Sequence, residues 1–290
     1  MDPSRPAIVG EVVLNLAGVG ILCGLVHGRV VGKRRPAAAL ADWDLPALDF
    51  LLFLGLTLTA GFAAQVLLGF AIRRFHLDPD TRLVCLGAAM DGGVLAGAAL
   101  FQVIVRRWRT ALRGSLGGLL AGGAATFLVA VPIVNVVSAV WQAILNWCGV
   151  PVVRQDMVDV LLNTHSPATR NVLIVLAVAV APMAEEVVFR AGMFRFLRTH
   201  LPRLAAKLAA ESTGRRPWLG PRLARALALL IPAALFGAAH GSLSFLPPLL
   251  VLGVVFSLAY ERTGMIGTTI VAHGLFNLNT IVLVFAGLTS

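Results

Sequence analysis

The residues best suited to chemistry are two adjacent carboxylates inside an apolar stretch, Glu185 and Glu186, followed by Arg190. In hydrocarbon an ionisable side chain costs at least about 2.5–3.5 kcal/mol at the centre of a helix, so few are kept without a reason. Arg190 lies four residues after Glu186 and meets that carboxylate on one helix face. Glu185 is rotated by about 100° around the axis and is left available as a general base. Taken alone, these residues fit a purely structural buried ion pair equally well.

Pro182 stands three residues before Glu185 in the same apolar stretch. A proline inside a helix removes one backbone hydrogen bond and can kink the helix. In a membrane such a break is tolerated where it faces protein or water. We therefore expect room for water beside the two glutamates.

Two further polar pairs stand at a spacing of four residues, Phe236 with His240 and His273 with Asn277. The Phe236 ring can pack against the His240 imidazole and fix its orientation. His273 and Asn277 project from one helix face and offer two hydrogen-bond donors to one point. Two such donors are what an oxyanion needs when a peptide carbonyl becomes tetrahedral. One membrane histidine is more often structural, but three pairs in the last third of the chain favour a catalytic site.

The elements that must position these residues are predicted to be membrane-spanning helices. Of the 290 residues 58% are hydrophobic and 13% charged, whereas a soluble domain has about 25% charged residues. We expect one domain, 1–290, that is an all-α polytopic bundle of about eight transmembrane helices around an intramembrane polar cavity. The predicted spans are 8–28, 46–71, 83–105, 115–147, 171–192, 226–244, 246–260 and 266–287.

Several details of these spans are expected from single residues. The 115–147 segment exceeds one span and is expected to be tilted or broken near Pro132. The first segment is too long for a cleaved signal peptide and carries Glu11 too early. The other ionisable residues in or near the spans are solitary and are interpreted as structural: Glu11, His27, Asp49 and Asp91. The three cysteines are interpreted as small buried hydrophobes, not disulfides or zinc ligands: Cys23, Cys85 and Cys148.

The net charge of +10 lies in short basic clusters between the apolar runs. Such clusters act as orientation signals and contact anionic lipid headgroups, and no nucleic-acid module fits between the spans. The positive-inside rule places both termini outside and 193–225 in the cytoplasm, with an interfacial helix at 197–211. The Ala-, Leu-, Arg- and Gly-rich composition favours the bacterial cytoplasmic (inner) membrane.

Together and in this order, the three motifs resemble those of the CAAX-protease and bacteriocin-processing family of intramembrane glutamic endopeptidases. Its E-E-x-x-x-R motif corresponds to Glu185–Arg190, its F-x-x-x-H motif to Phe236–His240 and its H-x-x-x-N motif to His273–Asn277. The YERTG sequence at 260–264 is similar to the loop before the third motif. Ala191 departs from the glycine that members often carry there. The resemblance covers about 170–280.

The resemblance implies hydrolysis by water without a covalent acyl-enzyme and without a cofactor. Glu185 and His240 would activate the water, and His273 and Asn277 would stabilise the oxyanion. Glu186 and Arg190 would hold these groups in place, and Phe236 would shape the substrate pocket. The substrates would be proteins or peptides at the membrane, which in eukaryotic members are prenylated and cut before their last three residues.

Three alternatives stay open: a zinc-dependent membrane protease, a non-proteolytic scaffold or immunity-type protein of the same family, and a proton-coupled transporter. Zinc is disfavoured because H-E-x-x-H is absent and Asn277 is a poor ligand. A transporter should show paired broken helices in an internal repeat. The catalytic reading requires Glu185, His240 and His273 to converge, although simple alternation places His240 near the far end of its span.

Overall fold

The computed structural model describes residues 4–30, 40–105, 115–153, 156–211 and 218–288, and these ranges contain helices joined by loops and no strand. Eight helices within them are long and apolar enough to cross a membrane. Their lengths agree with the roughly 20 residues that span a bilayer. The prediction of an all-α, multi-pass membrane protein is therefore confirmed.

The elements follow the chain as α-helices interrupted by one 3₁₀ segment, η1, and two π-helical segments, η2 and η3. Their bounds are α1 Ser4–Val30, α2 Ala47–Ala71, η1 Ile72–Arg74, α3 Pro79–Val105, α4 Leu116–Trp147, α5 Asp156–Asn163, α6 Pro167–Val175, η2 Leu176–Val180, α7 Ala181–Glu186, η3 Val187–Phe194, α8 Arg195–Glu211, α9 Pro221–Ala239, α10 Leu246–Thr263 and α11 Ile266–Phe285.

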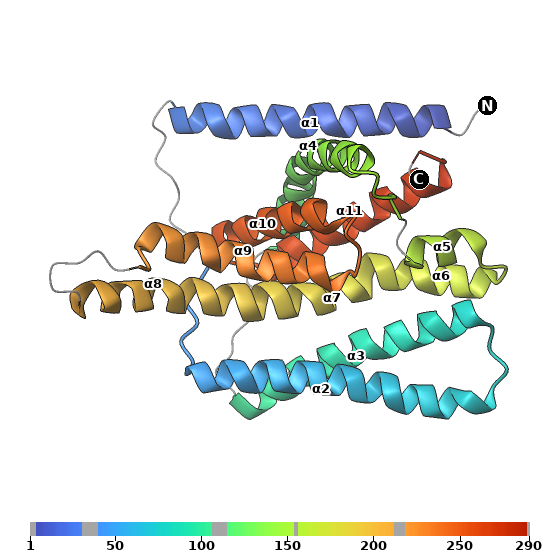
Figure 1. Ribbon diagram of the computed structural model, residues 1–290, viewed down its shortest axis with the longest axis horizontal. Coiled ribbons are helices and arrows are strands. Elements are labelled where there is room, and N and C mark those ends of the chain that lie inside the picture. The colour runs from blue at the N-terminus through green and yellow to red at the C-terminus, as the bar shows by residue number, and fades with distance from the viewer. Residues whose placement is uncertain (1–3, 31–39, 106–114, 154–155, 212–217, 289–290) are drawn as a thin grey trace.

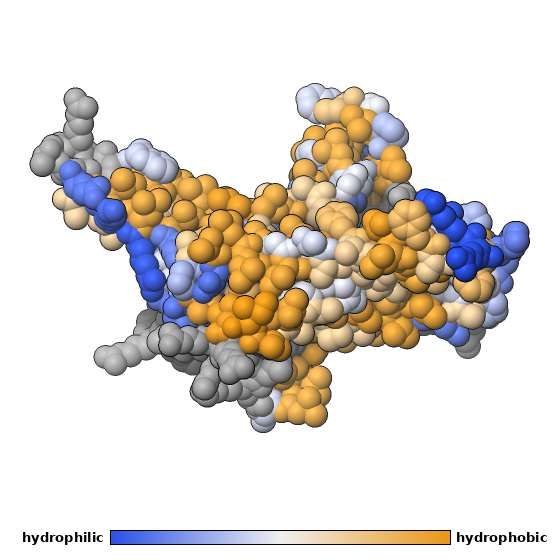
Figure 2. Space-filling view, turned by 90° about the horizontal axis from the view of Figure 1, so that it is seen from below, coloured by the Kyte–Doolittle hydropathy of each residue, from blue (hydrophilic) through white to orange (hydrophobic). Residues whose placement is uncertain are grey.

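A central layer of helices from the second half of the chain carries the polar motifs (Figure 1). The continuous run α6 to α8 extends along the molecule, with α9, α10 and α11 packed against it. The α2–α3 hairpin covers one side of this layer, and α4 and α1 cover the other. A broad apolar surface separates hydrophilic patches at the two ends of the molecule (Figure 2), as expected where lipid surrounds the middle.

The run from α6 to α8 is one uninterrupted helix, Pro167–Glu211, of 45 residues. At about 1.5 Å per residue it exceeds the roughly 30 Å hydrocarbon core, so α8 continues beyond the span. The separate interfacial helix predicted at 197–211 is instead its direct extension. Strong helix formers fill this stretch, and Pro202 lies inside the helix without ending it.

Helix α4 is continuous through Pro132, so of the two expectations, a tilt or a break, the break is not found. Pro132 leaves the Leu128 carbonyl without its usual helical donor, and Gly18 of α1 lies against this carbonyl and the proline ring. Because Gly18 lacks a Cβ, the two helices approach closely at this point.

Glu11 is not solitary, which corrects its interpretation from the sequence. Its Oε1 accepts hydrogen bonds from Asn15 Nδ2 at 3.1 Å and Asn135 Nδ2 at 2.6 Å, and its Oε2 accepts one from Asn279 Nδ2 at 3.1 Å. These bonds tie α1 to α4 and α11. Hydrogen bonds of this kind help helices associate in a membrane, because apolar side chains contact lipid tails as favourably as they contact another helix.

The cysteines also differ in part from their interpretation. All three are free, but Cys23 and Cys148 are exposed and Cys85 is partly buried. Position within an apolar run therefore does not distinguish a side chain that faces lipid from one that faces the bundle.

The loop before α2 fastens the α2–α3 hairpin to the central layer. Buried Trp43 packs edge-on against Phe50 and Phe53 and stacks on Phe101. Its backbone N–H donates to Thr199 Oγ1 of α8 at 2.9 Å. Trp43 thus joins the α2–α3 hairpin, which its ring contacts, to α8, which its backbone N–H contacts.

We predict that Trp43→Ala lowers the free energy of unfolding by about 3–5 kcal/mol, because removing a large buried aromatic leaves a cavity. The measurement is thermal unfolding of the purified protein in detergent. Trp147→Ala is the matched control, since the Trp147 side chain is exposed. Equal shifts for the two variants would contradict an anchoring role for Trp43.

Candidate active site

Glu186 and Arg190 form an ion pair that is shut off from solvent. Arg190 Nη1 lies 2.9 Å from Glu186 Oε1, and the side chains are 1% and 0% exposed. The pairing predicted from their spacing is therefore present. Neither Arg190 Nη atom has a well-directed hydrogen bond among the described residues, so charge attraction holds this contact.

Two aromatic rings complete the surroundings of Arg190. Its guanidinium carbon lies 4.4 Å from the centroid of Phe236 and 5.4 Å from that of Phe256. A cation over an aromatic face is attracted by the ring quadrupole, by about 2 kcal/mol or more when desolvated. Phe236 of α9 and Phe256 of α10 thus draw both helices against η3.

His273 of α11 lies between the two glutamates. Its Nδ1 is hydrogen-bonded to Glu186 Oε1 at 3.0 Å, and its Nε2 lies 3.6 Å from Glu185 Oε2. The 3.6 Å separation exceeds a hydrogen bond. His273 is therefore fixed through Glu186, with its second nitrogen turned toward Glu185.

Glu185 differs from its neighbour in its access to solvent. Its side chain is 27% exposed, whereas that of Glu186 is 0% exposed. Its Oε2 is nevertheless buried and has no hydrogen-bond partner among the described residues. A helix places consecutive side chains about 100° apart, which accounts for two environments at adjacent positions.

Two wide helical turns flank the glutamates, since η2 ends just before α7 and η3 begins just after it. In η2 the Ala181 N–H donates five residues back, to the Leu176 carbonyl. The next donor in this pattern would be Pro182, which has no N–H, so the Ala177 carbonyl lacks a backbone partner. Asn277 Nδ2 donates to that carbonyl at 2.8 Å. Helix π-segments are frequent at functional sites.

His240 ends α9 and contacts the site through Phe236. Its Nδ1 lies 2.9 Å from the Phe236 carbonyl, which can only accept, so Nδ1 carries the proton and Nε2 is free to accept. The Phe236 ring meets both His240 and His273 edge-on, with centroids 5.0 and 5.7 Å apart. Gly241, at φ +65°, turns the chain out of the helix after His240.

The register of α9 bears on the conflict between His240 and simple alternation of spans. Helix α9 begins at Pro221, earlier than predicted, and runs antiparallel to α8 (Figure 1). Phe236 packs on Phe189 with centroids 5.5 Å apart. His240 follows Phe236 by one turn, as Glu185 precedes Phe189 by one turn on the antiparallel helix. The start of α9 packs against α8, which extends the glutamate helix in the opposite direction.

Asp91 of α3 is a carboxylate near the site that sequence reasoning treated as structural. It lies close enough to Glu185 for the two charges to interact. The glycines beside Asp91 do not indicate this contact. Gly93 instead packs against the backbone of Ala60 and Gly61 in α2. The contact between α3 and the glutamate helix could not be inferred from spacing.

The predicted oxyanion pair is only partly juxtaposed. The His273 nitrogens face Glu186 and Glu185, while one N–H of Asn277 is used on Ala177. The Nε2 edge of His273 faces Glu185 at 3.6 Å, beyond hydrogen-bond distance. Within the described ranges no group of three or more His, Cys, Asp or Glu residues is arranged to hold a metal ion.

Comparison with known proteins gives one family. Residues 167–279 match the family described as type II CAAX prenyl endopeptidase Rce1-like. The segment runs from the start of α6 into α11 and includes all seven residues predicted for the site. The resemblance inferred from the motifs is thereby confirmed. No curated protein and no solved structure matches the chain.

We predict that Gly274→Ala disturbs the site, because an added Cβ would clash with the Val178 carbonyl in η2. Overpacking of this kind costs about 1–3 kcal/mol, and the shift would also displace His273 and Asn277. Thermal unfolding in detergent measures the effect. Gly55→Ala is the control, since nothing lies within 4 Å of its added Cβ. A Gly274→Ala protein as stable as this control would contradict the close approach of α11 to η2.

Proposed function

We propose, for a chain whose residues 167–279 form an Rce1-like domain, that the protein is an intramembrane endopeptidase that uses a glutamate-activated water. Its substrates would be membrane-associated proteins or peptides. The observation that carries the proposal is the unequal burial of two adjacent carboxylates. Glu186 is sealed against Arg190, while Glu185 is partly exposed and has an unpartnered oxygen.

The Glu186–Arg190 pair would act as the support of the site. Its two charges balance each other, which leaves Glu185 as the glutamate outside the pair. Through Glu186 the pair also holds His273, whose Nε2 edge is turned toward Glu185. A scissile carbonyl placed at this edge would receive a hydrogen bond from His273 when both ring nitrogens carry protons, since Nδ1–H already donates to Glu186 and only a protonated Nε2 can donate. Asn277 would supply the second donor. Preorganised donors of this kind stabilise the tetrahedral oxyanion.

Glu185 and His240 would share the proton transfers. His240 has its Nδ1 proton bonded to the Phe236 carbonyl, which directs its Nε2 lone pair outward as a base. Water loses a proton to this pair as its oxygen attacks the carbonyl carbon. The same proton then passes to the amide nitrogen as the C–N bond breaks. The second water proton stays on the new carboxyl group and then passes to the amine, so the products are a carboxylate and a protonated amine, with no acyl-enzyme.

We predict that Glu185→Gln and His240→Ala each lower the rate of cleavage about 10²–10⁴-fold, which is the usual contribution of a positioned acid or base. Glu185→Gln should keep wild-type thermal stability, since that side chain does not belong to the sealed ion pair. His240→Ala should lower it, because the Phe236 carbonyl loses its partner. The measurement is cleavage of a panel of membrane-tethered peptides by purified protein in proteoliposomes, with and without a metal chelator. Glu211→Gln, an exposed carboxylate of α8, is the control.

The outcomes separate the alternatives. Cleavage that survives the chelator and disappears in both variants supports the glutamate mechanism. Cleavage abolished by the chelator would replace it with a zinc protease. Full activity of Glu185→Gln in the absence of metal would overturn the assignment of the base.

A separate prediction concerns Asn277. Asn277→Ala should lower kcat about 10²–10³-fold, as loss of an oxyanion donor does, with little change in KM. It should also lower the unfolding temperature, because the Ala177 carbonyl loses its partner. Asn279→Ala, two residues on, breaks a bond to Glu11 and should leave kcat unchanged. A fall in stability with normal kcat would show that Asn277 is only structural.

A further inference from the structure

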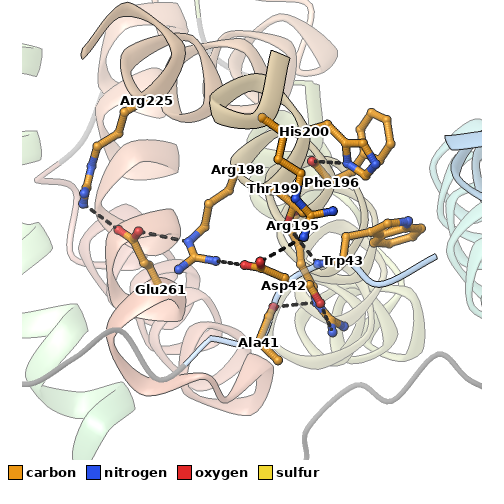
Figure 3. A network of polar contacts seen from close by, with 11 residues as sticks. Ala41, Asp42, Trp43, Arg195, Phe196, Arg198, Thr199, His200, Arg225 and Glu261 are labelled. Atoms are coloured by element: carbon orange, nitrogen blue, oxygen red, sulfur yellow. Dashed lines mark hydrogen bonds and ion pairs between the residues drawn. The ribbon is translucent and has the colours of Figure 1, made fainter. Parts of the chain in front are cut away.

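A cavity of about 410 Å³ lies apart from the glutamates, between the ends of α8, α9 and α10 and the loop before α2. Its polar lining comes from Asp42, Arg198, Arg203, Arg225 and Glu261, and its apolar lining includes Phe194. Figure 3 shows the ion-pair chain that crosses this region, from Arg225 through Glu261 and Arg198 to Asp42.

The three arginines of the cavity differ in how many ion pairs each one makes. Arg198 is 19% exposed and pairs with both carboxylates, Asp42 at 3.2 Å and Glu261 at 3.0 Å. Arg203 and Arg225 are 59% and 66% exposed, and each bonds one carboxylate through a single nitrogen. Three guanidinium groups thus face two carboxylates, which leaves one positive charge. Since a guanidinium has five N–H donors, Arg203 and Arg225 retain donors for a ligand.

The cavity lies at the level where membrane spans end. Helix α9 begins at Pro221, α10 ends at Thr263 and α2 begins at Ala47, and lining residues lie within a few positions of each of these ends. Trp218 lies just before α9 and Leu223 lies in its first turn, and both side chains are exposed. Tryptophan is enriched at membrane–water interfaces. The cavity therefore opens at the depth of lipid headgroups.

We propose that this cavity binds the phosphate of an anionic phospholipid headgroup between Arg203 and Arg225. Guanidinium groups match phosphate oxygens in paired hydrogen bonds, and basic pockets between span ends are suited to anionic headgroups. The volume is in the range of small-molecule sites. The apolar lining at Phe194 and Leu229 would contact the glycerol and the start of an acyl chain. This inference does not depend on the proposed proteolysis.

A peptide carboxylate is the competing ligand, and the distance from the glutamates disfavours a short one. Arg198 follows Glu185 by thirteen residues on the same continuous helix, which corresponds to roughly 20 Å. Three extended residues span at most about 11 Å. The carboxylate of a short leaving peptide held at Glu185 would not reach the cavity.

The experiment is native mass spectrometry of the full-length protein in detergent, titrated with short-chain phosphatidylglycerol, short-chain phosphatidylcholine or glycerol phosphate. We expect phosphatidylglycerol to bind about tenfold more tightly than phosphatidylcholine, and Arg203→Gln/Arg225→Gln to lose about tenfold in that affinity. Lys207→Gln/Arg222→Gln is the matched control. It removes two positive charges from the same two helices outside the cavity and should change affinity less than about twofold.

Four results would overturn the proposal. Equal loss in the two double variants would indicate diffuse surface charge, and equal binding of the two lipids would remove the headgroup preference. Glycerol phosphate that binds as tightly as the lipid, with the same dependence on Arg203 and Arg225, would make the ligand a free phosphate compound. An acidic peptide added to the same titration that binds more tightly than phosphatidylglycerol, and loses that affinity in Arg203→Gln/Arg225→Gln, would make it a peptide site.

Discussion

A charge pair buried in the membrane constrains the second half of this molecule. Breaking such a pair by removing one partner costs about 3–5 kcal/mol, because the other charge is left uncompensated. Glu186 and Arg190 satisfy each other along one helix, but the pair still needs polarisable neighbours on every side. His273, Phe236 and Phe256 provide them from α11, α9 and α10. The packing of these three helices around the glutamate helix follows from this single requirement.

The glutamate helix carries its own irregularity at the same level. Pro182 cannot donate in the π-pattern of η2, and Asn277 of α11 supplies the missing hydrogen bond to Ala177. Gly274, one turn before Asn277, permits the close approach that this bond requires. The third motif therefore carries two contacts to the glutamate helix, one to a carboxylate and one to a backbone carbonyl. Sequence spacing alone suggested only a pair of donors for substrate.

The sequence was informative where the physics is local. Apolar length predicted the spans, and a spacing of four predicted the Glu186–Arg190 pair, because both depend on the geometry of one helix. Contacts between distant segments were missed: Glu11 with Asn135 and Asn279, and Asp91 near Glu185. The level of His240 was also uncertain, since it depends on where α9 starts and how far α8 extends. Such registers are set by tertiary contacts, which one sequence without relatives does not reveal.

Adjacent carboxylates in one helix illustrate how environment, not residue type, assigns chemical roles. Glu185 and Glu186 have the same side chain and the same depth, yet one is 27% exposed and the other sealed. The difference arises from the 100° step between neighbours, which turns Glu186 toward Arg190 and leaves Glu185 at the edge of the packed group. The ion pair thus orients His273 and leaves Glu185 as the carboxylate outside the pair.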